Sequence, residues 1–461
     1  DMRDTLRSNF PADDARVLSA QLEIADSRVK LGYPDNALDI YADVEKAAIA
    51  AGQNQIATLA KLRANLLIYA IGENERYQPD MKRARAALAE MVKRPLPGSD
   101  DFSLIAECDV VVICVPTPLT KYREPDLSYV EMTGRAVSEN MSSGTLVVLE
   151  STTFPGTTSE VLQPILAQSN LTPNQDFWVA FSPEREDPGN AKYRTATIPK
   201  IVGADTPQAR DLVAAFYGNV VDAVVPVSSS SAAEAVKITE NVFRAVNIAL
   251  VNELKVIFDA MGIDVWEVIN GAATKPFGYM PFYPGPGLGG HCIPIDPFYL
   301  TWKAREYGHT TKFIELAGEI NVNMPNYVVA KVREALDRSQ GVGLRGARIL
   351  LVGVSYKKNV PDMRESPSVK LLEMLEDQGA SVDFLDPHVP EVPKMREYPH
   401  LFGRTAVEPG DVSSRNYQAI LIATDHDAID YGALAALEIP VVDTRNAFAS
   451  RGLPMDLVTK A

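Results

Sequence analysis

A cysteine in a glycine-rich stretch is the residue of this chain with the clearest chemical potential. Cys292 follows the sequence GPGLGG, lies beside His291 and precedes Asp296 by four residues. A thiolate in such a polar turn could be exposed and tuned to act as a nucleophile, whereas a lone cysteine is usually a small buried hydrophobe. The pattern leaves both interpretations open for Cys292. For Cys108 and Cys114, which lie in or beside an apolar run, it favours burial.

The same stretch fits the formal pattern of a dinucleotide-binding turn, G-x-G-x-x-G, through Gly285, Gly287 and Gly290. Such a turn needs a strand before it and a helix directly after it. The flanks KPFGYMPFYPG and HCIPIDPFYL provide neither, and a second formal match at residues 341–346 comes before its strand. We therefore interpret the glycines as letting the backbone approach a ligand closely beside Cys292, and not as a cofactor fingerprint.

Bulk composition excludes several classes of protein. The 461 residues carry a net charge of −15, which argues against a general nucleic-acid binder. Three cysteines without a C-x-x-C pair predict neither a disulfide framework nor a metal site. No apolar run reaches the roughly 18 residues that span a bilayer, and residues 1–14 lack the layout of a secretion signal. We expect a cytoplasmic protein with reduced thiols and no membrane segment.

The elements that must position these residues change in character along the chain. Residues 1–97 are Ala/Leu-rich with apolar positions three and four apart, which predicts helical hairpins, one of them faintly resembling a tetratricopeptide unit. From residue 98 onward, apolar runs such as DVVVICV, TLVVLE and FWVAFSP alternate with helical patterns. Residues 98–205 therefore predict a doubly wound parallel sheet, whose ligands would lie at the carboxyl ends of its strands.

Two further regions complete the predicted architecture. Residues 206–324 are mainly helical, and a long helix within 232–280 is expected to link two α/β regions and to offer a dimer seam. Residues 325–461 contain a complete strand, helix, strand unit that begins at RILLVGV. The predicted fold class is α/β, with doubly wound parallel sheets in two domains, a long central helical region that joins them, and an extra all-α N-terminal segment.

Several motifs together resemble the UDP-glucose/GDP-mannose dehydrogenase family. They are PGPGLGGHCIPIDP, CVPTPLTKYREPDLSYV, ESTTFPGTTSEV, FSPEREDPGN, AAEAVKITENVFRAVNIALVNEL and GVSYKKNVPDMRESPSVKLLE. They follow family order and spacing over residues 99–461. Their amino-acid sequences are most similar to those of the family branch that oxidises UDP-N-acetylglucosamine. The resemblance implies an NAD-dependent, four-electron oxidation of the C6 alcohol of a UDP-N-acetylhexosamine to the uronate, for surface polysaccharide precursors.

The resemblance also implies roles for individual residues. Cys292 is the nucleophile that forms a thiohemiacetal and then a thioester. Lys237 and Asn241, four apart on one helical face, stabilise the alkoxide and oxyanion. Asp296, with Thr152, positions and deprotonates water, and Glu184 serves in the hydrolysis of the thioester. The implied substrate contacts are Lys237, Tyr283, Gly289 and Lys357, and the implied cofactor contacts are Pro116, Thr117, Thr152 and Arg364. The implied assembly is a homodimer, or a higher homo-oligomer, that pairs through the central helices.

Each of these residues also has a structural interpretation. On pattern alone, Lys237 and Asn241 fit an ordinary solvated helix pair, and Glu184 fits a turn cap. Lys357 and Arg364 could be surface cations. Glu186 and Asp187 are expected to be solvated, and the second glutamate that UDP-glucose members carry after the Pro-Glu pair has no counterpart here. The hydrolytic role therefore falls on Glu184 and Asp296.

The chain departs from the family pattern at its beginning. Family members open with a strand and a G-x-G-x-x-G turn, but residues 1–97 show only helical patterns there. A pyrophosphate on helix N–H groups supplies much of the anchoring of a dinucleotide, so this departure predicts an incomplete NAD site. The resemblance then implies that residues 98–205 are the remaining, nicotinamide-side half of the NAD-binding domain. The departure leaves a second hypothesis open, namely a non-catalytic UDP-sugar-binding or scaffold protein derived from this family.

Overall fold

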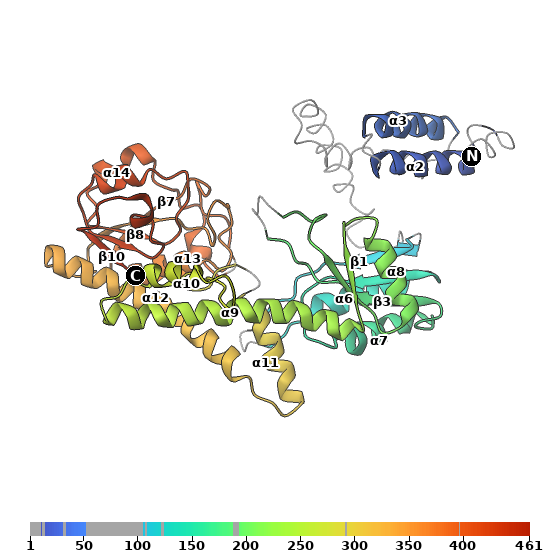
Figure 1. Cartoon of the computed structure of the whole chain (residues 1–461), viewed down its shortest axis with the longest axis horizontal. Coiled ribbons are helices and arrows are strands. Elements are labelled where there is room, and N and C mark those ends of the chain that lie inside the picture. The colour runs from blue at the N-terminus through green and yellow to red at the C-terminus, as the bar shows by residue number, and fades with distance from the viewer. Residues whose placement is uncertain are drawn as a thin grey trace. The chain divides into compact units, whose positions relative to one another are not determined.

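The computed structural model describes residues 11, 14–30, 34–51, 105–106, 108–120, 124–187, 193–290, 293–395 and 397–461. The chain forms two compact units, residues 1–104 and residues 105–461. In the first unit, helix α2 (Ala15–Lys30) packs against helix α3 (Pro34–Ala50) through Leu18, Leu22 and Tyr41 (Figure 1). Both helices fall where helices were predicted. The other helices predicted within 52–97 lie outside the described residues.

The second unit begins with a five-stranded sheet in the order β1-β2-β3-β4-β5. Its strands are β1 (Val110–Ile113), β2 (Thr145–Leu149), β3 (Phe177–Phe181), β4 (Lys200–Gly203) and β5 (Val224–Val227). Every residue of β2 is buried, as its continuous apolar run predicts. The connecting helical elements are α6 (Ser128–Asn140), the π-turn η3 (Thr157–Leu162), α7 (Gln163–Leu166), η4 (Ala167–Ser169) and α8 (Pro207–Tyr217).

One strand pair in this sheet differs from the prediction of an all-parallel arrangement. Strands β1, β2 and β3 are parallel, as are β4 and β5, but β3 and β4 are antiparallel through Phe181 and Gly203. The segment after β3 leads into the Pro-Glu motif, whose Glu184 carbonyl accepts a hydrogen bond from Lys237 of helix α9 (Ser230–Ala260). An antiparallel neighbour needs no crossover helix, so the chain can re-enter the sheet directly from this loop.

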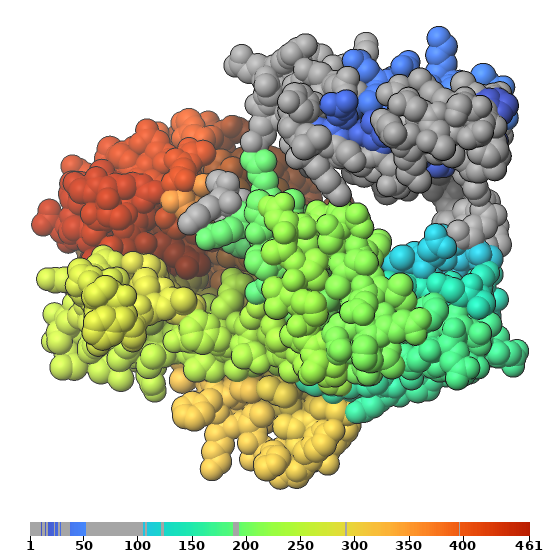
Figure 2. All heavy atoms as spheres, turned by 45° about the vertical axis from the view of Figure 1, so that its right-hand side comes forward, coloured from blue at the N-terminus to red at the C-terminus, as the bar shows by residue number. Residues whose placement is uncertain are grey.

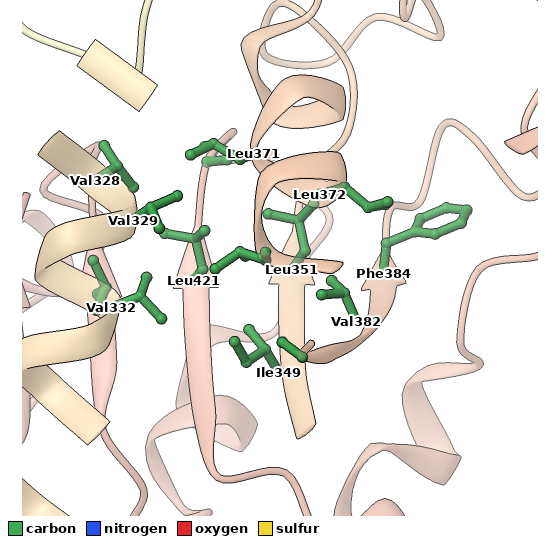
Figure 3. Close-up of a cluster of buried hydrophobic side chains, with 14 of the residues drawn as sticks. Val328, Val329, Val332, Ile349, Leu351, Leu371, Leu372, Val382, Phe384 and Leu421 are labelled. Carbon is green, nitrogen blue, oxygen red and sulfur yellow. The ribbon is translucent and has the colours of Figure 1, made fainter. Parts of the chain in front are cut away.

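A second sheet, entirely parallel, has the order β10-β9-β8-β6-β7. Its strands are β6 (Arg348–Val352), β7 (Ser381–Leu385), β8 (Ala419–Ile422), β9 (Val441–Asp443) and β10 (Val458–Lys460). Alternating side chains of β6 supply two cores, because Ile349 and Leu351 face one layer while Leu350 and Val352 face the other. Figure 3 shows the first core, where α12 (Lys312–Gln340) and α13 (Pro367–Asp377) pack over β6, β7 and β8.

Shorter helices cover the opposite face of the second sheet, and with them the two predicted α/β regions are confirmed. The 3₁₀ turn η6 (Pro409–Arg415) and helix α14 (Tyr431–Ala435) contribute Val412, Tyr431 and Leu434 to the second core. The remaining 3₁₀ turns are η5 (Pro399–Leu401) and η7 (Ala449–Arg451).

Four helices form the central region that links the two sheets. They are α9 (Ser230–Ala260), α10 (Val265–Ala273), α11 (Asp296–Glu306) and α12 (Lys312–Gln340). Helix α9 begins at the N-cap Ser229, whose side chain accepts from the Ala232 amide, and its first turns pack on β3, β4 and β5. Near its other end, Lys255 Nζ donates to the Lys460 carbonyl of β10 at 2.8 Å. The predicted linking helix is therefore present, and Figure 1 shows its course.

Within the described parts of the chain, no helix combines the length and the apolar character that crossing a bilayer requires.

Candidate active site

The glycine-rich loop is tied to the central helices by a buried chain of amides. The Gly285 amide donates to Asn252 Oδ1 of α9 at 3.0 Å, and Asn252 Nδ2 donates to Asn321 Oδ1 of α12 at 2.9 Å. Asn321 Nδ2 in turn donates to the Ala245 carbonyl at 3.1 Å. A buried amide network in which the donors and acceptors are paired fixes geometry strongly, so the loop is held in one position relative to α9.

The glycines of this loop are required because the chain itself approaches closely. A Cβ on Gly289 would lie 2.9 Å from Pro367 and 3.0 Å from Tyr356, and a Cβ on Gly290 would lie 3.0 Å from the Tyr356 ring. Gly290 also has φ of +86°, which disfavours other residues. The described contacts thus explain these glycines by packing against the segment after β6 and the start of α13. His291 and Cys292 lie outside the described residues.

Lys237, Asn241 and Asp296 are all buried near one another at the junction of α9 and α11. Asn241 Nδ2 donates to Asp296 Oδ2 at 2.5 Å, and Lys237 Nζ donates to the Glu184 carbonyl at 2.5 Å. The three residues are 8%, 3% and 4% exposed, respectively. The interpretation of Lys237 and Asn241 as a solvated helix pair is therefore wrong, since the same helical face that aligns them is turned inward.

Burial gives the Asp296 carboxyl an unusual proton affinity. Removal from water raises the pKa of Asp296 to about 7, although the nearby Lys237 ammonium and the hydrogen bond from Asn241 act in the opposite direction. A carboxyl group that titrates near neutrality can accept a proton and release it again under physiological conditions. Asp296 therefore has the chemistry of a general base or acid.

A cavity of about 260 Å³ connects Asp296 to the carboxyl ends of β1 and β2. Thr117 Oγ1 donates to the Thr152 carbonyl at 2.7 Å, and the Tyr299 hydroxyl of α11 donates to the Thr117 carbonyl. These bonds join the two strand-end loops to the helix that carries Asp296. The cavity is lined by Cys114, Val115, Pro116, Thr117, Glu150, Ser151, Thr152, Glu184 and Asp296.

This lining suits one end of a dinucleotide cofactor. Hydroxyl groups and main-chain amides at the carboxyl ends of parallel strands are where open α/β sheets bind such ligands. Three of the residues predicted to contact the cofactor line the cavity, namely Pro116, Thr117 and Thr152. Glu184 and Asp296, which were predicted to be catalytic, line it as well. Arg364 does not: its guanidinium pairs with Asp362 at 2.7 Å, and its side chain is 70% exposed.

The two described cysteines are exposed, contrary to the predicted burial. Cys108 precedes β1, and Cys114 follows it where the sheet opens onto the cavity, so neither lies in the strand interior. Although the residue is exposed, the Cys114 sulfur is partly shielded from water, and this shielding and the Glu150 carboxylate 3.5 Å away raise the pKa of Cys114 to about 11. This thiol stays protonated at neutral pH and is a poor nucleophile.

Two residues that the sequence did not single out hold the site together. Glu234, one turn before Lys237 on α9, accepts from the Gly156 amide at 2.6 Å and from the Thr158 amide at 2.8 Å. Burial raises the pKa of Glu234 to about 6, and these hydrogen bonds limit that rise. Glu234 thus fixes the loop after β2, as Tyr299 fixes the loop after β1. The sequence contained one indication of this role for Glu234, because its spacing from Lys237 places both residues on the same helical face.

Substrate contacts implied by the resemblance are dispersed around this centre. Lys357 Nζ pairs with Asp187 Oδ1 at 2.5 Å, so Asp187 is not merely solvated as predicted, whereas Glu186 is exposed. Tyr283 stacks on Trp266 with ring centroids 5.4 Å apart, and its hydroxyl donates to Asn270 at 2.9 Å. The pair of Lys357 and Asp187 joins the segment after β6 to the Pro-Glu loop that borders the cavity.

Comparisons with known proteins agree with the motifs. Three domain descriptions of the UDP-glucose/GDP-mannose dehydrogenase family match the chain: the NAD binding domain over residues 74–221, the central domain over 231–323 and the UDP binding domain over 350–450. A UDP-N-acetyl-D-glucosamine 6-dehydrogenase of Salmonella typhi is 37% identical over 335 residues, which cover 72% of this chain and 77% of that protein.

Other relatives differ in the sugar that their names specify. A UDP-N-acetyl-D-mannosamine dehydrogenase of Methanococcus maripaludis is 35% identical over 326 residues, covering 70% of each protein. Among solved structures, a UDP-D-ManNAc dehydrogenase from Pyrococcus horikoshii has a TM-score of 0.66 at 32% identity, and the match covers 74% of this chain and 78% of that one.

Proposed function

The chain belongs to the UDP-glucose/GDP-mannose dehydrogenase family, an NAD-dependent family, and on that premise we propose that it oxidises the C6 alcohol of UDP-N-acetylglucosamine to the carboxylate. The observation that supports this reaction most directly is the buried group of Lys237, Asn241 and Asp296 beside a cavity at the strand ends. Burying a cation, an amide and a carboxyl group together costs free energy of folding. Such buried ionisable groups are typical of reaction centres, where they are needed for chemistry.

The first oxidation removes a hydride from C6 and a proton from the C6 hydroxyl group, and the C6 oxygen must be stabilised while that proton passes to solvent. When bound, NAD accepts the hydride that leaves C6. In our proposal Pro116, Thr117 and Thr152 hold the nicotinamide end of the cofactor, because they line the cavity. The Lys237 ammonium and the Asn241 amide stabilise the negative charge on the C6 oxygen as its proton departs. The products of this half-reaction are an aldehyde, NADH and a proton.

The second oxidation needs a covalent intermediate on the enzyme. We assign the nucleophile to Cys292, whose sulfur bonds to the aldehyde carbon and gives a thiohemiacetal. Loss of a second hydride from that carbon, together with the proton of its hydroxyl group, would leave a thioester, and a second NAD would be the hydride acceptor. Asp296, with a pKa of about 7, then takes a proton from water, which attacks the thioester carbon and releases the carboxylate and the Cys292 thiol. Thr152 and Glu184, which line the same cavity, position that water in our proposal.

The alternative, a non-catalytic UDP-sugar-binding or scaffold protein, is not favoured. A binder has no need for a carboxyl group with a pKa near neutrality beside a buried ammonium. The domain match to the NAD binding domain and the relatives named as dehydrogenases point to the enzyme.

The choice of sugar epimer is the part of the proposal that a single experiment decides. NADH formation should be followed by absorbance with UDP-N-acetylglucosamine and, in parallel, with its manno and galacto epimers. We expect the highest kcat/KM with the gluco sugar. A higher kcat/KM with another epimer would identify that sugar as the substrate. If none of the three sugars reacts, the proposed function is rejected.

We further propose a homodimer that pairs through α9. The exposed side of this helix carries Phe243, Leu250, Ile257 and, just after its end, Met261, at intervals of seven, seven and four residues. This is the spacing of a seam between two packed helices. The yellow-green segment that includes α9 and α10 lies at the surface in Figure 2. An exposed apolar row of this kind usually marks an interface.

Introducing a charge into this row is expected to separate the subunits. The Leu250→Glu substitution would place a carboxylate in an apolar seam, where it cannot be solvated. Size-exclusion chromatography with light scattering should show the mass of the wild-type dimer halved in this variant. Val220→Glu, which changes an exposed apolar residue outside α9, should leave the mass unchanged. A wild-type monomer, or a Leu250→Glu variant of unchanged mass, would reject the interface.

A further inference from the structure

A cluster of buried polar side chains fills the carboxyl edge of the second sheet. In the order β10-β9-β8-β6-β7, the direction of the strand connections reverses between β6 and β8. Open α/β sheets usually bind a ligand in the crevice at that point. Here Ser355, Asp386, Thr424 and His426 occupy it, and each is at most 3% exposed. The crevice is therefore filled by the protein's own side chains.

Asp386, at the end of β7, organises the beginning of the segment after β6. Its Oδ2 accepts from the Val354 amide at 2.8 Å and from the Ser355 amide at 3.2 Å. Its Oδ1 accepts from the His388 amide at 2.8 Å. Although burial acts to raise it, the pKa of Asp386 is lowered, because hydrogen bonds from His426 and the backbone favour the carboxylate. A charged carboxylate thus anchors one end of this segment.

His426, after β8, connects that carboxylate to the other end of the same segment. The Asn359 amide donates to His426 Nδ1 at 2.9 Å, and His426 Nε2 lies 3.0 Å from Asp386 Oδ2. Because a backbone amide can only donate, Nδ1 carries no proton, and the ring proton belongs on Nε2, where it is donated to Asp386. The ring therefore spans from Asp386 to Asn359 with both nitrogens in use.

The segment held in this way, residues 353–360, carries two side chains toward the reaction centre. Gly353 packs closely against the segment after β8, since a Cβ there would lie 2.2 Å from the Thr424 carbonyl oxygen. Tyr356 packs against Gly289 and Gly290, which are three and two residues before the proposed nucleophile Cys292 in the sequence. Its neighbour Lys357 pairs with Asp187 on the Pro-Glu loop.

We propose that His426 is a positioning residue of the reaction, which acts by holding residues 353–360 so that Tyr356 supports the cysteine loop and Lys357 reaches the UDP-sugar. This inference rests on the proposed function, because it assigns Lys357 to substrate binding. His426 itself contacts neither substrate nor cofactor. Its effect is selective: binding of the UDP-sugar depends on the segment that His426 holds, whereas the cavity at β1 and β2 is built from other residues.

Two substitutions separate the bonds of the ring. The His426→Gln variant can still donate to Asp386 but leaves the Asn359 amide without its acceptor, whereas His426→Asn places an oxygen near the position of Nδ1. We expect His426→Gln to raise KM for UDP-N-acetylglucosamine about tenfold, the equivalent of one lost hydrogen bond, with KM for NAD unchanged. His426→Asn should recover most of that loss. Equal KM values in wild type and both variants, or parallel increases in both KM values, would overturn the proposal.

A second measurement does not depend on activity or on the folding of variants. In the full-length wild-type chain labelled with ¹⁵N-histidine, the nitrogen spectrum at neutral pH should show His426 as the neutral Nε2–H tautomer. Protonation of Nδ1, alone or in a charged ring, would overturn the proposal. A wild-type chain with this tautomer that oxidises no UDP-N-acetylhexosamine would instead reject the proposed function.

Discussion

The Cys292→Ala variant is expected to form no measurable uronate while it still binds UDP-N-acetylglucosamine. Without the sulfur nucleophile, an aldehyde produced in the first oxidation has no covalent tether for the second, and no thioester forms. We expect kcat to fall by at least about 10³-fold, because a nucleophile cannot be replaced by the remaining groups of the site. NADH absorbance together with mass spectrometry of the sugar product measures this loss directly.

Cys108→Ala provides the matched control, because Cys108 is exposed ahead of β1 and does not line the cavity. It should leave kcat near the wild-type value. A Cys292→Ala variant that still makes uronate at a comparable rate would show that the thioester route is wrong and would favour direct attack of water on the aldehyde.

Substituting Asp296 is expected to slow the reaction strongly and to remove the fall in kcat at acidic pH. Only the ionised carboxylate can accept a proton, and its pKa is about 7, so wild-type kcat should fall as the pH drops below that value. The Asp296→Asn variant should be slower by about 10²- to 10⁴-fold, the usual contribution of a general base, and should lose this acidic limb. Asn241 can still donate to the side-chain oxygen of the new residue, which limits structural disturbance.

The raised pKa of Asp296 also makes the stability of the folded protein depend on pH. The folded-state pKa of Asp296 lies above the ordinary value of 3.8, so the folded protein binds more protons than the unfolded chain between that value and about 7. The contribution of this carboxyl to stability is complete below the lower value and is lost as the pH rises through about 7. Asp296→Asn should lack that loss, which paired unfolding curves at pH 5 and pH 8 can detect.

Asp222→Asn is a suitable control for these measurements, since Asp222 is an exposed carboxylate outside the cavity. It should alter neither the rate nor the pH profile. An Asp296→Asn variant that retains the wild-type acidic limb would assign that limb to another group and would contradict the role given to Asp296.

Sequence patterns predicted the two α/β regions and the helix between them, because continuous apolar strands and a long amphipathic helix leave few alternatives. They also placed Lys237 and Asn241 on one helical face. They could not show that this face is buried, since that depends on Glu184 and Asp296, which reach it from distant parts of the chain. The exposure of Cys108 and Cys114, at the two ends of β1, was also mispredicted. An apolar run does not show which of its residues lie beyond the buried part of the strand.

Long-range ion pairs and hydrogen bonds were equally invisible in the sequence. Asp187 and Lys357 are 170 residues apart, and His426 meets the Asn359 amide across 67 residues. Nothing in the local pattern of either stretch specifies its partner. The antiparallel pairing of β3 and β4 could not be predicted either, because the apolar pattern of a strand is the same in both directions and the connecting loop decides which way the strand runs.

The stoichiometry of NADH formation tests the central claim most directly. With saturating NAD and a limiting amount of UDP-N-acetylglucosamine, the full-length chain should form two molecules of NADH for each uronate and release no aldehyde. One NADH per sugar with free aldehyde would contradict the covalent route. No NADH at saturating cofactor from any UDP-N-acetylhexosamine would contradict the assignment as a dehydrogenase of these sugars.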